Sequence, residues 1–291
     1  MKRQLWLLAL VAAVLLNVAP VLADDIYVIG GGGVGTRIAS LPYTISSPGF
    51  YYLTGSLSLT GSGNGITISS DDVTLDLMGF RVNGPGPNAT VNNFGIHMSG
   101  RQNVEIRNGT LSGWWQGVRE DGGARHRALN LRVESSVGGI FFGGAVGAQF
   151  LVKGCIVDVG FGDVGIYLQG GIASGNVVRS SAGDGIDLAE GGIMIGNSVS
   201  NCYVGINGRE APGGVTISGN SATNCSLYGI QCIGPSSVIG NTVVTGPSGS
   251  TGIFIGTSSA CLVTQNTVAG AGTHFTPGAG TINVANTNAG F

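Results

Sequence analysis

Short runs in which apolar and polar residues alternate recur along the chain, and each run follows a glycine. The apolar members of four such runs are Ile96 and Met98, Ile166 and Leu168, Ile186 and Leu188, and Ile253 and Ile255. A spacing of two puts both apolar side chains on the same side of an extended strand. The pattern therefore predicts many short strands, each with one buried face, and no unit contains a ten-residue amphipathic helix.

The runs belong to two interleaved repeats of about twenty to thirty residues. The first repeat is a glycine followed by Ile or Val, with its glycines at Gly65, Gly95, Gly117, Gly139, Gly165, Gly185, Gly205, Gly229 and Gly252. The second is Gly-Asn, with its asparagines at Asn176, Asn197, Asn220, Asn241 and, after Gln265, Asn266. We expect the glycines to form corners with positive φ and the asparagines to stack in a ladder that satisfies its own hydrogen bonds.

Together the two series resemble the repeats of the right-handed parallel β-helix family, which includes the pectate lyases, over roughly residues 65 to 285. The resemblance implies an all-β, single-domain right-handed parallel β-helix. At a rise of roughly 4.8 Å per coil, about nine to eleven coils would form a straight rod. We place the β-helix at residues 49–285, after a lead-in and cap at 24–48 and before a tail at 286–291.

The first 23 residues have the features of a secretory signal peptide. Lys2 and Arg3 precede the apolar run from Leu5 to Leu16, and Ala23 ends a small-residue cleavage site. The run is shorter than the roughly 20 residues of a membrane span. We therefore expect a secreted or periplasmic protein that is not inserted in the membrane after cleavage. The net charge of −2 also argues against a nucleic-acid partner.

The residue after each Gly-Ile or Gly-Val pair should point outward, so its equivalents should form a column on one face. That column is His97, Arg119, Phe141, Tyr167, Asp187, Asn207, Gln231 and Phe254. Two residues further along lies a second column of Ser99, Asp121, Gly143, Gln169, Ala189 and Arg209. Sugar rings stack on aromatic side chains and sugar hydroxyls bond to polar ones, so this face suits a polysaccharide or cell-surface glycan. The predicted contacts are His97, Phe141, Tyr167, Gln169, Asn207, Arg209 and Gln231. The alternative is an ordinary solvated strand surface.

Candidate catalytic residues come from the charged side chains, which make up only 10% of the chain. They are Arg119, Glu120, Asp121 and Asp187. Glu120 stands where other coils have an apolar residue, so it is either functional or part of a strand irregularity. Asp184 and Asp187 are either a carboxylate pair or turn caps in solvent.

Relatives of the β-helix type include lyases, often aided by Ca²⁺, and hydrolases with paired carboxylates. None of their catalytic motifs occurs in this sequence, so no catalytic residue can be transferred. We expect a lyase or hydrolase, or alternatively a non-catalytic surface-binding or structural protein. No metal site is predicted, and no residue pattern supports Ca²⁺.

Five cysteines occur, at positions 155, 202, 225, 232 and 261. Cys202 and Cys225 each follow a ladder asparagine by five residues, so they should stack in adjacent coils within disulfide range. We predict a disulfide between them. Cys155 aligns with Asn176, and Cys232 aligns with a buried apolar row. We expect no cysteine counterpart for Cys155, Cys232 or Cys261.

Overall fold

The computed structural model describes residues 28–29, 33–87, 92–160, 163–179, 182–209, 214–256, 260–270, 272–283 and 288–290. The expected signal peptide lies outside the described residues, as does part of the expected C-terminal tail. The chain forms two compact units, Met1–Gly35 and Thr36–Phe291. In the first unit, β1 (Val28–Ile29) and β2 (Gly33–Val34) form a short antiparallel pair.

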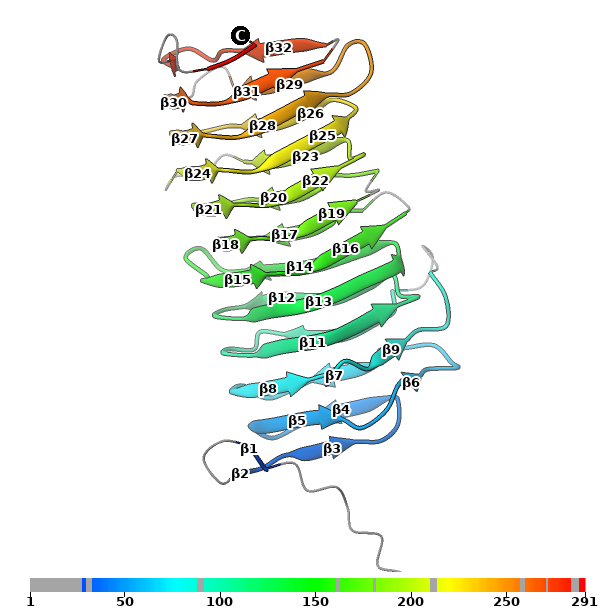
Figure 1. The fold of residues 1–291 in the computed structure, drawn as a ribbon. Helices are drawn as coiled ribbons and strands as arrows, with labels where there is room; N and C mark the ends of the chain where they lie inside the picture. The colour runs from blue at the N-terminus through cyan, green and yellow to red at the C-terminus, as the bar shows by residue number, and fades with distance from the viewer. Residues whose placement is uncertain are drawn as a thin grey trace, which may run out of the picture. The chain divides into compact units, whose positions relative to one another are not determined.

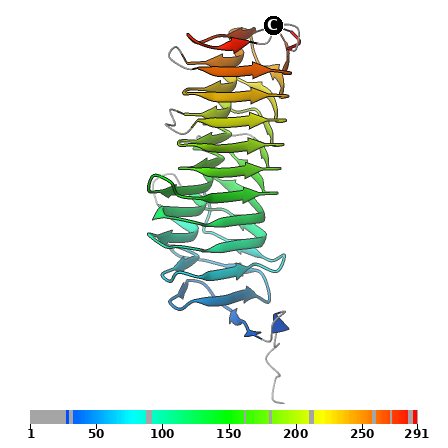
Figure 2. The same ribbon diagram turned by 90° about the vertical axis from the view of Figure 1, so that its left-hand side faces the viewer.

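The second unit is a parallel β-helix, as the sequence predicts. Its strands pair in parallel with strands one coil away and lie above one another in chain order (Figures 1 and 2). The eleven strands of one sheet mark the successive coils, within the expected nine to eleven. Parallel pairing begins at Thr36, inside the segment that the sequence assigned to the lead-in and cap.

Most coils contribute one strand to each of three sheets. Sheet 1 contains β4 (Tyr43–Ile45), β7 (Ile66–Ile68), β10 (Phe94–Ser99), β12 (Gln116–Gly123), β14 (Gly138–Gly144), β17 (Ile166–Leu168), β20 (Ile186–Leu188), β23 (Val204–Gly208), β26 (Tyr228–Cys232), β29 (Thr251–Ile255) and β32 (Thr273–Thr276). Sheet 2 contains β3 (Thr36–Ile38), β5 (Gly49–Leu53), β8 (Val73–Asp76), β11 (Glu105–Ser112), β13 (Arg127–Ser136), β15 (Phe150–Lys153), β18 (Gly171–Ser174), β21 (Gly192–Ile195), β24 (Val215–Ser218), β27 (Ser236–Ile239), β30 (Cys261–Thr264) and β33 (Ile282–Asn283).

Sheet 3 contains β6 (Leu57–Ser58), β9 (Arg81–Asn83), β16 (Ile156–Val159), β19 (Val177–Arg179), β22 (Ser198–Ser200), β25 (Ser221–Cys225), β28 (Thr242–Thr245) and β31 (Thr267–Ala269). The long strands β11 and β13 continue from sheet 2 into sheet 3, because each pairs with strands of both.

The core lies inside the coil and consists of columns of like residues. One column of sheet 1, in register from coil to coil, is Ile66, Ile96, Val118, Ile140, Ile166, Ile186, Ile206, Ile230 and Ile253. These side chains are at most 1% exposed. Their removal from water is the main favourable term for stacking the coils.

The two glycine series have different physical roles. Gly175, Gly196, Gly219 and Gly240, which precede the ladder asparagines, have φ between 63° and 66°, as expected for corners. The glycines before Ile or Val do not have positive φ, so that part of the expectation is wrong. Space restricts them instead: a Cβ on Gly185 would lie 2.6 Å from the carbonyl oxygen of Gly205 and 2.3 Å from Cγ1 of Val199.

The predicted asparagine ladder is confirmed. The Oδ1 atom of each ladder residue accepts hydrogen bonds from the backbone amide and side-chain amide of the asparagine one coil before. Its Nδ2 also donates to a buried carbonyl oxygen, as Asn197 does to Ala173 at 2.9 Å. Cys155 begins the ladder through its amide, and Asn288 extends it beyond Asn266.

We predict that Asn197→Ala lowers the free energy of unfolding by at least about 2 kcal/mol. The substitution leaves the amides of Asn176 and the carbonyl oxygen of Ala173 buried without these partners, and each such group costs about 1–3 kcal/mol. Urea unfolding measures the change. Asn83→Ala, whose side chain makes exposed hydrogen bonds on sheet 3, is the control and should change stability by less than about 0.5 kcal/mol. Equal losses in the two variants would contradict a structural role for the ladder.

Candidate functional site

Sheet 1 brings both predicted outward columns into register. Each residue from His97 to Phe254 pairs with the next member of its column. In the second column, Ser99, Asp121 and Gly143 pair directly. The backbone amides of Gln169, Ala189 and Arg209 then bond to carbonyls in the preceding coils. The order of the columns is therefore confirmed, whereas the roles of their side chains need separate arguments.

Arg119, Phe141 and Tyr167 form a continuous stack along the first column. The Cζ atom of Arg119 lies 3.9 Å from the centroid of the Phe141 ring. The rings of Phe141 and Tyr167 lie 4.4 Å apart with an interplanar angle of 9°. Both faces of Phe141 are thus covered by protein groups, and only its edge remains for a ligand. The expectation that a sugar ring stacks on the face of Phe141 is wrong, because coil stacking brings the aromatic rings onto one another.

Tyr167 begins a chain of hydrogen bonds that crosses to the second column. Its hydroxyl donates to Oε1 of Gln169 at 2.8 Å, and Nε2 of Gln169 donates to Oε1 of Glu190 at 2.9 Å. The other oxygen of Glu190 accepts the Gly147 amide at 3.2 Å. Burial, with the negative charge of Asp187, raises the pKa of Tyr167, so the hydroxyl stays a donor.

Asp187 lies one coil further along and forms, with Asp184, Asn207 and Arg209, what we call the Asp187 cluster. Nη2 of Arg209 contacts Oδ2 of Asp187 and lies 3.7 Å from Oδ2 of Asp184. Nδ2 of Asn207 donates to the same Asp184 oxygen at 2.7 Å. Two carboxyl groups therefore lie against one guanidinium nitrogen.

Asp187 differs from the exposed residue that the sequence predicts, because its side chain is 0% exposed. Among the described residues, its Oδ1 atom has no hydrogen-bond partner. Burial raises the pKa of Asp187 to about 7, and repulsion from Asp184 adds to this, while the charge of Arg209 opposes it. The expectation of an exposed carboxylate is wrong, since the neighbouring coil supplies an arginine that covers it.

Arg119 and Asp121 are held by contacts on the same face. Nε of Arg119 donates to both Asp121 oxygens at 2.9 Å, and Nη2 donates to Oδ1 at 2.6 Å. Nη1 of Arg119 also bonds to Gln116, whose Nε2 donates to Asp163 at 2.7 Å. These pairings satisfy the charges locally and lie away from the Asp187 cluster along the sheet.

Glu120 does not share the outward face with Arg119 and Asp121. It stands in register with Met98 and Phe142, and its side chain is 0% exposed. Oε2 of Glu120 lies 3.4 Å from Nε2 of the equally buried His126. The place of Glu120 in the apolar row is therefore confirmed, and the residue pairs with a histidine inside the coil. The register shift between Asp121 and Gly123 is a strand irregularity, one of the two interpretations of Glu120 that the sequence leaves open. A catalytic role for Glu120 stays a prediction.

His97 and Gln231 lie toward opposite ends of the column. His97 stacks on Phe94, with 5.0 Å between ring centroids, and lines a hollow of about 260 Å³ with Thr67, Ser69 and Arg101. Burial lowers the pKa of His97, so the ring favours its neutral form. Gln231 lies in register between Asn207 and Phe254. Neither residue belongs to the Asp187 cluster.

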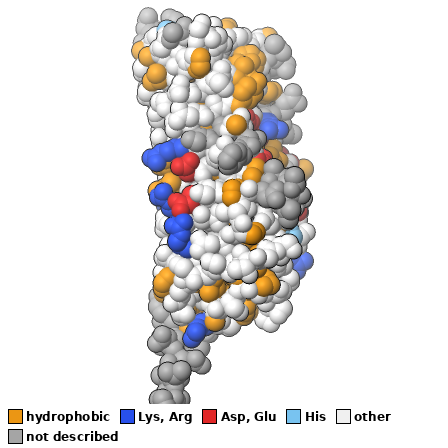
Figure 3. Space-filling view, turned by 90° about the vertical axis from the view of Figure 1, so that its right-hand side faces the viewer, with side chains coloured by type: hydrophobic (Ala, Val, Ile, Leu, Met, Phe, Trp, Pro, Cys, Tyr) orange, Lys and Arg blue, Asp and Glu red, His pale blue; other side chains and the backbone are white. Residues whose placement is uncertain are grey.

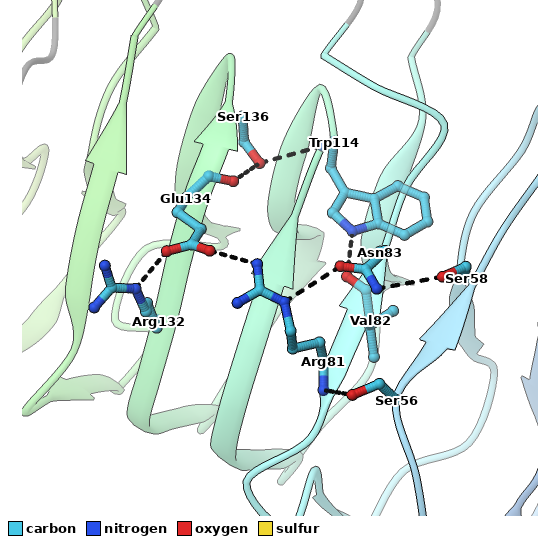
Figure 4. Close-up of polar contacts among 9 residues, drawn as sticks. All are labelled: Ser56, Ser58, Arg81, Val82, Asn83, Trp114, Arg132, Glu134 and Ser136. Carbon is cyan, nitrogen blue, oxygen red and sulfur yellow. Dashed lines mark hydrogen bonds and ion pairs between the residues drawn. The ribbon is translucent and has the colours of Figure 1, made fainter.

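The arginines between residues 101 and 134 are divided among the sheets rather than gathered in one site. Arg107 and Arg127 pair with Glu105 on sheet 2. On sheet 3, Glu134 contacts Arg132 of its own strand, β13, and Arg81 of β9, which lies on the far side of β11 (Figure 4). Hydrogen bonds from the two arginines lower the pKa of Glu134. Charged side chains gather along one edge of the view in Figure 3, and most of that face is uncharged.

The cysteines depart in one respect from expectation. Cys202 and Cys225 occupy equivalent positions in adjacent coils, as predicted. Two residues before them Ser200 pairs with Thr223, and the amide of Ser226 donates to the Cys202 carbonyl oxygen. None of the five cysteines, all of them described, is in a disulfide in the structure, so that bond stays a prediction. The expectation that Cys232 and Cys261 lack a cysteine neighbour is wrong, since their sulfur atoms lie 3.8 Å apart.

Within the described residues, no group of three or more His, Cys, Asp or Glu side chains is arranged to hold a metal ion. None of these residues forms a helix with the length and apolarity of a membrane span.

The Asp187 cluster is thus the part of the outward face that is best suited to acid–base chemistry. It combines a carboxyl group that exchanges its proton near neutral pH with a second carboxyl, an arginine and a nearby tyrosine hydroxyl. Sequence reasoning found Asp187, Asn207 and Arg209 but missed that Gln169 would meet Glu190. The signal that could have revealed this contact is the spacing of 21 residues between Gln169 and Glu190, which is one coil.

A solved structure with a similar fold is the Dettilon tailspike protein gp208, with a TM-score of 0.63 and 15% sequence identity. The alignment covers 87% of this chain and 59% of the tailspike chain. No curated protein matches the sequence. The family described as right handed beta helix region matches residues 138–289, which is more than half of the chain. Together with the parallel coils and the confirmed repeats, this match shows that the chain belongs to the right-handed β-helix family.

Proposed function

We propose that this protein binds a polysaccharide along the outward face of sheet 1, with the Asp187 cluster and the Tyr167–Gln169 pair as the central contacts. The face is long and straight and presents polar side chains on most of its coils, which suits a polymer of repeating hydroxyl-bearing units. Similarity of fold to a tailspike protein is in keeping with a polysaccharide ligand in general. Fold alone does not determine function, so the support for a polysaccharide ligand comes from the side chains of the cluster.

The observation that carries the proposal is the Asp187 carboxyl group, which is buried, has a pKa near 7 and lies beside a half-exposed arginine. A buried carboxyl with an unsatisfied oxygen is costly for stability. Such groups are concentrated at functional sites, where a ligand supplies the missing partner. A sugar hydroxyl is a suitable donor for Oδ1 once Arg209 moves aside.

The same cluster supports hydrolysis as the form of processing. Protonated Asp187 would donate its proton to the glycosidic oxygen as the bond to the anomeric carbon breaks. The Asp184 carboxylate would take a proton from the attacking water. A general acid works best when its pKa lies near the working pH, and that of Asp187 does. Arg119 is a poorer base for a lyase reaction, because Asp121 and Phe141 hold its guanidinium.

A non-catalytic binding or structural role is the second candidate. The specific observation that favours it is the internal pairing of the column, in which Arg119, Tyr167 and Asn207 already bond to protein groups. Turnover separates the two candidates. New reducing ends would indicate a hydrolase and unsaturated-product absorbance a lyase, whereas binding without either product would indicate a binding module.

We predict that Gln169→Ala weakens polysaccharide binding by about five- to tenfold, because it removes hydrogen-bonding groups worth about 1 kcal/mol beside the cluster. Affinity electrophoresis against neutral and uronic-acid polysaccharides measures the effect. Gln102→Ala, an exposed glutamine outside sheet 1, is the matched control and should bind normally. Equal weakening by both variants, or no binding to any of the polymers, would contradict the proposal.

A second prediction concerns pH. Because the pKa of Asp187 is raised on folding, the folded state holds a proton that the unfolded state loses near pH 4. The wild type should therefore lose stability relative to Asp187→Asn as pH rises from about 4 to about 7, and the difference should level off above that. We expect a change on the order of 4 kcal/mol in denaturant unfolding, because each pKa unit corresponds to about 1.4 kcal/mol.

Asp121→Asn, on the same face, measures the general effect of removing one negative charge. A difference between wild type and Asp187→Asn that does not vary with pH would mean that Asp187 has an ordinary pKa.

We also propose that the protein is exported after cleavage behind Ala23, which would bring the outward face to extracellular or periplasmic glycans. The expected result is a mature chain beginning at Asp24. N-terminal sequencing of protein recovered outside the cytoplasm tests this, and a chain beginning at Met1 would contradict it.

A further inference from the structure

Cys232 and Cys261 meet inside the coil at the corner between sheets 1 and 2. Cys232 ends β26, and Cys261 begins β30 in the following coil. Their sulfur atoms lie 3.8 Å apart, and the two residues are 0% and 1% exposed. Cys261 also donates to the carbonyl oxygen of Gly234 at 3.1 Å. The contact is therefore diagonal, from one coil to the next, rather than between equivalent positions.

Packing alone does not require sulfur at these positions. In sheet 1, Cys232 stands in register with Ile255, and Leu188 occupies the same column two coils earlier. In sheet 2, Cys261 pairs with Ser236. Because aliphatic side chains fill the sheet 1 column equally well, two cysteines that meet across the corner point to a covalent use.

We propose that Cys232 and Cys261 form a disulfide bond when the protein folds in an oxidising medium. A disulfide has sulfur atoms about 2.05 Å apart, so each sulfur needs to move by only about 0.9 Å. With a low-molecular-weight disulfide such as oxidised glutathione as oxidant, one cysteine thiolate attacks it and forms a mixed disulfide, releasing one glutathione thiol. The second cysteine then attacks the mixed disulfide, releasing the other. The protein loses two protons and two electrons, and one oxidised glutathione takes them up to become two reduced ones.

The bond would fasten the C-terminal end of the solenoid. Each coil of a solenoid contacts only its neighbours, so the terminal coils are the first to open. Cys232 belongs to the coil of β26, β27 and β28, and Cys261 to the coil of β29, β30 and β31. Among the described residues, the strands beyond these are β32 and β33. A covalent link at this point prevents the last complete coil from separating from the one before it.

This pair is distinct from Cys202 and Cys225, the pair predicted from the sequence. Equivalent residues in stacked coils have parallel side chains, which puts their Cβ atoms about 4.8 Å apart. Disulfides have Cβ atoms about 3.5–4.5 Å apart, so the stacked pair has to close up before it can bond. The diagonal pair already has its sulfur atoms in contact.

The decisive experiment maps disulfides in the wild-type chain after refolding in a glutathione redox buffer. Trypsin is unsuitable, because no Lys or Arg follows Arg209, but chymotrypsin cleaves after Tyr228, Phe254 and Leu262. Without reduction, mass spectrometry should find peptide 229–254 joined to peptide 255–262, two hydrogens lighter than the sum of the separate peptides. Recovery of both peptides separately, each alkylated on its thiol, would overturn the proposal.

Thermal unfolding gives an independent readout. Reduction should lower the melting temperature of the wild type by about 5 °C or more. Cys202→Ala removes the other predicted bond, so the shift should be retained in Cys202→Ala and abolished when Cys261→Ala is added to it. A shift that survives in the Cys202→Ala, Cys261→Ala double variant would contradict the assignment. If the double variant does not fold, the peptide map of the wild type still decides the question.

Discussion

Everything in this β-helix depends on the close, in-register approach of one coil to the next. The backbone spacing of parallel strands leaves no room for a Cβ at Gly185, because that atom would clash with the carbonyl oxygen of Gly205. The ladder of asparagines uses the same spacing, because each Oδ1 reaches the amides of the previous coil. Register in turn makes residues about 20 apart in sequence into neighbours in space.

This constraint shapes the candidate site. A side chain on sheet 1 is surrounded mainly by its equivalents one coil before and after, so its chemistry is set by them. Phe141 has its faces covered by Arg119 and Tyr167, and Asp187 is covered by Arg209. The raised pKa of Asp187 follows from that burial. A ligand on this face must therefore compete with existing contacts rather than fill an empty groove.

Periodicity alone predicted the features that repeat. The strands of sheet 1, the order of both outward columns and the asparagine ladder follow from counting residues, because register converts an interval in sequence into a position in space. Features that depend on side-chain direction did not follow. Three contacts between residues at non-equivalent positions of the repeat were missed. Arg209 covers Asp187, Glu120 pairs with His126, and Cys232 meets Cys261. The glycines before Ile were assigned to corners, although lack of space, and not positive φ, is what restricts them.

We propose above all that the Asp187 cluster is the part of sheet 1 that contacts a polysaccharide. The most direct measurement is a ¹³C NMR titration of the Asp187 side-chain carboxyl, with and without a polysaccharide that binds. We predict a pKa near 7 for Asp187 in the unbound protein and a clear displacement of that pKa when the polymer is present. A carboxyl that titrates near its ordinary value, or one whose titration the bound polymer leaves unchanged, would contradict it.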